Sequence, residues 1–134
     1  MYRSRILILA AGDLALLLLF ILLGQIDHST LNESNPIAGA LPTFAPLAIA
    51  WLVIAFLLRA FPREPQGLVP FLARTLLAWL IAAPLGLLLR ATLLDRTVAT
   101  PFLLVTLGLG GLMLLTWRAV FWLLAMRRRG KTRL

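Results

Sequence analysis

Ile6–Gly24 reads ILILAAGDLALLLLFILLG, and this stretch decides the class of the protein. A helix needs about 20 consecutive apolar residues to cross the hydrocarbon core of a bilayer, and this run has that length. Its one charged residue is Asp13. The alternative is a signal peptide, but the run is long for one, and the residues after Leu22 make a poor cleavage site. We therefore predict a retained membrane span.

The rest of the chain repeats this pattern. Of its 134 residues, 61% are hydrophobic and 13% are charged, whereas a soluble domain carries about a quarter charged residues. Further apolar runs cover approximately residues 42–58, 70–90 and 101–126, each starting near a proline, which suits the first turn of a helix. We expect an all-α fold with one domain over residues 1–134. This domain is a four-helix transmembrane bundle with short loops and no extramembrane domain.

The basic residues predict the orientation of the spans. Five of the 13 Lys and Arg residues form the C-terminal tail, and four more fall on the same side of a four-span chain: Arg127, Arg128, Arg129, Lys131 and Arg133 in the tail, then Arg3, Arg5, Arg59 and Arg63. Cytoplasmic segments carry the excess of Lys and Arg, so we expect both termini in the cytoplasm and residues 25–40 outside. The net charge of +8 then reflects topology and contact of the tail with anionic lipids of the bilayer, and not nucleic-acid binding.

Asp13, Arg74 and Arg118 are charged and lie inside the predicted spans. At 1.5 Å per residue, Asp13 lies roughly 10 Å and Arg118 roughly 12 Å from the cytoplasmic ends of their spans. Either charge alone would be costly in hydrocarbon, so the similar depths predict an Asp13–Arg118 ion pair. Arg74 either joins this intramembrane cluster or extends towards the headgroups. Such charges are candidates for a functional site, and a structural pair that sets helix register is the alternative.

A second polar corner is expected on the outer side, where Asp27, His28 and Arg90 follow or end the first and third spans. One His with carboxylates in a loop is a weak metal pattern, and solvated loop residues are the simpler interpretation. The chain has no Cys and one His, which leaves no residues for thiolate chemistry, a Cys-based metal site or a haem held by two His. We expect no metal and no cofactor.

Gly108, Gly110 and Gly111 lie near the middle of the fourth apolar run, and Thr106 lies about one helical turn before Gly110. Small residues at this spacing let helices approach closely. We therefore expect helix packing at these three glycines, either within the bundle or across a dimer.

Short motifs over nearly the whole chain resemble those of one family. They are Gly12-Asp13 with the apolar run to Phe20, Gly24 to His28, Thr43-Phe44-Ala45-Pro46, Gly86 with Arg90, Pro101-Phe102 and Trp117-Arg118. They are similar to the motifs of a family of small four-span prokaryotic membrane proteins classed as a domain of unknown function. Gln25 stands where that family tends to have arginine. The resemblance implies the plasma (cytoplasmic, or inner) membrane of a prokaryote, and it implies no activity.

Two classes of function fit these features. The first is a transporter or channel for a small solute or ion, acting as a homo-oligomer, with Asp13 and Arg118 beside a polar path. The second is a non-enzymatic accessory subunit of a larger membrane protein complex. Serine nucleophile elbows, Gly-rich phosphate loops and metalloprotease motifs are absent from the sequence, so we do not expect an enzyme.

The predicted orientation can be tested with reporter fusions placed after Ser34, near Gly67 and after Leu134. The clustering of Lys and Arg predicts that these reporters are outside, inside and inside, respectively. An inverted order at any of the three positions would contradict the predicted topology.

Overall fold

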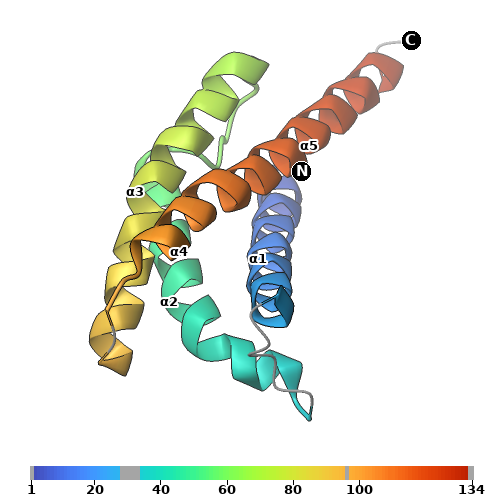
Figure 1. The fold of residues 1–134 in the computed structure, drawn as a ribbon. Coiled ribbons are helices and arrows are strands. Elements are labelled where there is room, and N and C mark those ends of the chain that lie inside the picture. Colours follow the sequence, from blue (N-terminus) through green and yellow to red (C-terminus); the bar gives the residue numbers. More distant parts are fainter. Residues whose placement is uncertain (1, 28–33, 96, 133–134) are drawn as a thin grey trace.

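The computed structural model describes residues 2–27, 34–95 and 97–132, and for Tyr2, Asp27 and Thr132 it describes the backbone alone. These residues form helices and no strand: α1 (Tyr2–Asp27), α2 (Pro36–Leu57), α3 (Leu68–Leu94), α4 (Thr100–Val105), the short π-helix η1 (Thr106–Gly110) and α5 (Gly111–Thr132) (Figure 1). α4, η1 and α5 follow one another without a break, so the described chain has four long helices. Each is long and apolar enough to cross a membrane. The predicted all-α, four-span fold is therefore confirmed.

The start of α2 differs from the prediction. Asn35 caps this helix, because its side-chain oxygen accepts a hydrogen bond of 3.2 Å from the Ala38 N–H, and Pro36 lies in the first turn. The predicted start near residue 42 is wrong, since Pro42 and Pro46 lie inside the helix. A proline within a helix removes one backbone hydrogen bond, which packed neighbours in a membrane bundle can tolerate. The other three long helices contain their predicted spans and extend beyond them at both ends.

The four long helices form a closed ring of contacts in the order α1, α2, α3 and α5. α2 and α3 share the most extensive interface. Gly86 of α3 makes their close approach possible, because a Cβ there would lie 2.9 Å from the Cα of Leu47 in α2. The start of α1, the link between α2 and α3 (residues 58–67), and the end of α5 lie towards the same end of the bundle (upper part of Figure 1). We call this the terminal end.

The inside of the ring is packed with aromatic and small side chains, and the outside is apolar. Trp51 and Trp79 are fully buried and meet edge to face, with 6.0 Å between ring centroids. Small residues of α3 such as Ala78, Ala82 and Ala83 make room for them. Leucines and other large apolar side chains on every long helix face outwards. Such a surface is unfavourable in water and suits contact with lipid.

η1 lies where the fourth span crosses Trp79. The Trp79 indole donates a hydrogen bond of 3.2 Å to the Leu107 carbonyl, and a Cβ on either Gly110 or Gly111 would lie 2.9 Å from the indole ring. Packing at these two glycines is thus confirmed. Gly108 makes no such contact within the chain, because its missing Cβ would have no neighbour within 4 Å among the described residues, and packing of Gly108 across a dimer stays a prediction. Residues two positions apart on a helix point in nearly opposite directions, so Gly108 and Gly110 cannot share one face.

Replacing Gly111 with Leu should destabilise the protein, because the new side chain would overlap the buried Trp79 ring. Overpacking of this kind costs about 1–3 kcal/mol. We expect a lower unfolding temperature in detergent and altered elution from a sizing column. Gly108→Leu is the matched control, since it adds the same side chain into open space and should change neither property. Equal effects of the two substitutions would contradict the packing described for Gly111.

Candidate functional site

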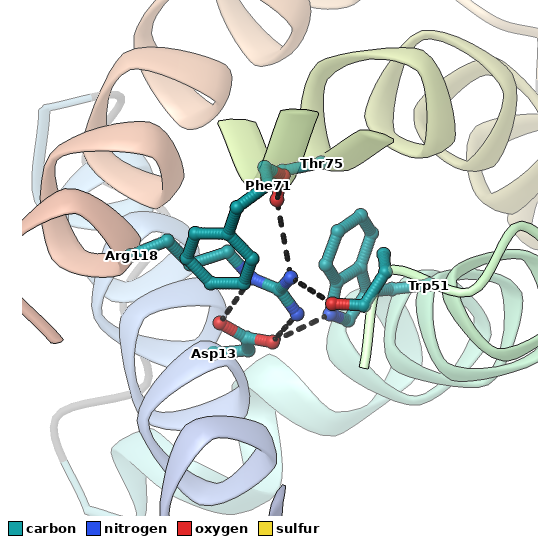
Figure 2. Close-up of polar contacts among 6 residues, drawn as sticks. Asp13, Trp51, Phe71, Thr75 and Arg118 are labelled. Atoms are coloured by element: carbon teal, nitrogen blue, oxygen red, sulfur yellow. Dashed lines mark hydrogen bonds and ion pairs between the residues drawn. The ribbon is translucent and has the colours of Figure 1, made fainter. Parts of the chain in front are cut away.

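Asp13 of α1 and Arg118 of α5 form an ion pair in the middle of the ring. The Arg118 Nη2 lies 2.6 Å from the Asp13 Oδ2, and the Arg118 Nε donates a second hydrogen bond of 3.2 Å to Oδ1 (Figure 2). Both side chains are 0% exposed. This bidentate geometry matches the planar guanidinium to the carboxylate and is the strongest form of such a pair. The contact predicted from the matched depths is confirmed.

The remaining polar atoms of the pair are bound by other parts of the ring. Arg118 Nη1 donates hydrogen bonds to the Ala60 carbonyl at 2.6 Å and to the Thr75 hydroxyl at 3.1 Å. The Trp51 indole donates to the Asp13 Oδ2 at 3.2 Å (Figure 2). One ion pair therefore joins all four long helices and the link between α2 and α3. A buried charge needs this degree of saturation, because each unmet hydrogen bond would add to the cost of removing it from water.

The Ala60 carbonyl is available because the chain turns sharply after α2. Arg59 has a φ of 57°, which is the left-handed region that non-glycine residues rarely adopt. The Ala60 N–H then bonds back to the Ala55 carbonyl at 2.8 Å, while the Ala60 carbonyl accepts from Arg118. A backbone conformation that costs about 1–2 kcal/mol is thus offset by a charged hydrogen bond inside the ring.

Three aromatic rings surround the Arg118 guanidinium. Its central carbon lies 4.9 Å from the ring centroid of Phe61, 5.0 Å from Trp51 and 5.6 Å from Phe71. The faces of aromatic rings carry partial negative charge, so they attract the cation while they exclude water. The guanidinium therefore has an apolar enclosure in which its pairing with Asp13 is strengthened.

The residues next to the ion pair form a second contact between α1 and α5. Gly12 lies directly against the Trp117 indole, and a Cβ at position 12 would overlap that ring. The doublets Gly12-Asp13 and Trp117-Arg118 therefore act as a unit: one member of each brings the helices together, and the other member forms the salt bridge. A larger residue at position 12 would move Asp13 away from Arg118.

Arg74 is not part of this cluster. Its side chain is exposed on α3, and the adjacent Thr75 is the α3 residue that reaches Arg118. Successive residues on a helix are turned by about 100°, so Thr75 and Arg74 cannot both face the interior. The sequence did not predict five further groups of this site, which are the side chains of Trp51, Thr75, Phe61 and Phe71 and the backbone carbonyl of Ala60. The sequence spacing could have indicated Thr75, because it lies on the same face of α3 as Trp79 and Gly86, and all three residues are buried.

The outer polar corner is described only in part. Arg90 donates from Nε to the Thr43 hydroxyl at 2.8 Å and lies over the Phe102 ring at 5.7 Å, which ties α3 to α2 and α4. His28 and the Asp27 side chain lie outside the described residues. Gln25, close to the end of α1, donates to the Gly39 carbonyl of α2 at 3.2 Å. Among the described residues no three His, Cys, Asp or Glu side chains gather as metal ligands would.

Comparison with known protein families shows to which family the chain belongs. The model of a family described as a protein of unknown function (DUF3054) matches residues 10–121. The chain belongs to this family. No curated protein and no solved structure matches it. The matched range contains both doublets of the ion-pair site, and also Thr43 and Arg90.

Asp13→Asn and Arg118→Gln should each destabilise the protein, because each leaves one buried charge without its partner. Breaking a buried pair in this way costs about 3–5 kcal/mol. The double variant should recover part of the loss, since it leaves no unpaired charge inside the ring. Thermal unfolding in detergent measures all three effects. Additive losses in the double variant would show that the two residues do not interact.

Proposed function

We propose that this protein moves a small anion across the membrane and that the Asp13–Arg118 pair is the gate of the route. The observation that carries the proposal is the position of the pair, at the centre of a helix ring and directly beneath a cleft at the terminal end. Charged residues inside a membrane commonly mark the path of a substrate or ion.

The cleft lies between the start of α1, the link, the start of α3 and the end of α5. Phe71 lines it, and the same ring covers the Arg118 guanidinium at 5.6 Å. Phe71 therefore lies between the cleft and the Arg118 guanidinium. A rotation of Phe71 is the smallest movement that would expose Arg118 to a solute in the cleft.

The interior beyond the pair carries further polar groups and favours an anion. The Thr106 hydroxyl is buried and has no hydrogen-bond partner among the described residues, and Arg90 with Thr43 follows towards the opposite end. Within the part of the chain that the structure describes, two arginines, Arg118 and Arg90, therefore lie along this interior, together with the carboxylate of Asp13. Arginine binds planar anions through the same fork that holds Asp13.

Protonation of Asp13 can open and close this gate. Protonation of the Asp13 carboxylate removes its negative charge and frees the guanidinium of Arg118 to bind an incoming anion. When the anion leaves on the other side of the membrane, Asp13 releases its proton to water on that side, and the carboxylate pairs with Arg118 again. Because side chains fill the ring, transport requires the helices to move against each other, as repeats of transporters do around a central site. We propose a homo-oligomer as the functional unit, since four helices alone enclose little space.

Flux into proteoliposomes tests this function, with chloride, acetate and phosphate as probes and a pH gradient as the driving force. We expect flux of at least one anion through the wild type and a loss of about tenfold or more in the Asp13→Asn/Arg118→Gln double variant, tested at a temperature where thermal unfolding shows this variant to be folded. Arg74→Gln is the matched control, because it removes an exposed arginine next to the site and should keep wild-type flux. Absence of wild-type flux for all three anions, or full flux in the double variant, would contradict the proposal.

A second candidate function is that of an accessory subunit, and the completeness of the ion pair favours it. Both Asp13 oxygens and all three Arg118 nitrogens have partners within the chain, as a purely structural element would require. Purification in mild detergent separates the two functions. A discrete homo-oligomer supports transport, and other chains present in fixed stoichiometry support the subunit.

A further inference from the structure

The cleft at the terminal end combines an apolar interior with charged residues at its rim. Ile6, Leu9 and Phe121 contribute apolar wall, while Arg5, Arg129 and Glu64 contribute charge. Arg5 and Arg129 are half-buried, whereas their neighbours Arg3, Arg127 and Arg128 are exposed. Arg5 and Arg129 therefore lie partly inside the cleft.

Gln66 adds an unused hydrogen-bond donor. Its backbone carbonyl accepts from the Trp122 indole at 2.9 Å, which holds the link against α5. Its side-chain Nε2 is buried and has no acceptor among the described residues, and Gln66 lines the cleft. Most buried polar groups have partners, so a buried donor without one points to an acceptor outside the described residues, and the cleft is where such an acceptor can reach Gln66.

We propose that the cleft binds one anionic phospholipid. The phosphate of its headgroup accepts from the Gln66 amide and pairs with Arg5 and Arg129, while its acyl chain packs along Leu9 and Phe121. The charges favour an anion, because the rim carries two arginines and one glutamate. The apolar wall favours a lipid over a free phosphate ion, since a bare ion would gain nothing from it. Basic side chains at the end of a span commonly contact anionic headgroups. This inference does not depend on the proposed transport.

Native mass spectrometry in detergent tests the site, with equal amounts of phosphatidylglycerol and phosphatidylcholine as probes. We expect the wild type to retain one phosphatidylglycerol in preference to phosphatidylcholine. The Arg5→Gln/Arg129→Gln variant should lose that preference by about tenfold or more, because each basic residue near a membrane surface contributes about 1 kcal/mol to binding an anionic lipid. Arg127→Gln/Lys131→Gln removes the same charge from exposed positions and should retain the lipid.

A second variant separates binding from folding. Gln66→Met keeps the size of the side chain and removes a donor that has no partner within the described residues, so it should not lower the unfolding temperature measured without lipid. It should still lower phosphatidylglycerol retention several-fold. Three results would overturn the proposal: equal retention of phosphatidylcholine, equal loss of lipid in the Arg127→Gln/Lys131→Gln control, or displacement of the lipid by millimolar inorganic phosphate.

Discussion

The structure depends on one constraint, which is that Asp13 and Arg118 must neutralise each other away from water. An isolated charge in hydrocarbon is costly, and a pair is tolerated only when its geometry is close and its remaining hydrogen bonds are made. Here α1 supplies the carboxylate and α5 the guanidinium, while α2, α3 and the link supply an indole, a hydroxyl and a backbone carbonyl. The hydrophobic effect drives little association between helices in lipid, so close packing and interhelical hydrogen bonds must hold them together. The saturated pair joins all four long helices and the link in one set of contacts.

Small residues make the arrangement sterically possible. Gly12 admits the Trp117 indole next to the ion pair, Gly86 admits the backbone of α2, and Gly110 with Gly111 admits Trp79. At three of these four sites a large aromatic ring fills the space beside a glycine. Shape and charge are therefore coupled next to the ion pair, because the contact of Gly12 with the Trp117 indole brings together the two helices that carry Asp13 and Arg118.

The proposed transport route and the proposed lipid site share a wall. Phe71 covers Arg118 on one side and lines the cleft on the other. A lipid in the cleft would hold this ring against the guanidinium and keep the ion pair enclosed. The two proposals are thus physically linked at one side chain, although each rests on its own observations.

Composition and local pattern were enough to predict four apolar helices, and the matched depths of Asp13 and Arg118 were enough to predict their pairing. Both follow from the bilayer itself, which demands a minimum length of apolar helix and penalises a lone charge. The predicted start of α2 was wrong because Pro42 suggested a first helical turn, whereas Asn35 and Pro36 form the actual start of the helix.

Other features arose only from tertiary structure. Thr75 faces inwards and its neighbour Arg74 faces outwards because of how α3 is rotated about its axis. Apolar residues lie on all sides of these helices, so the sequence pattern does not specify that rotation. The same holds for Gly108, which faces outwards, and for the Ala60 carbonyl, whose direction follows from the left-handed turn at Arg59. Rotation and turn geometry are decided by packing between residues far apart in the chain, so they appear only when the ring of helices closes.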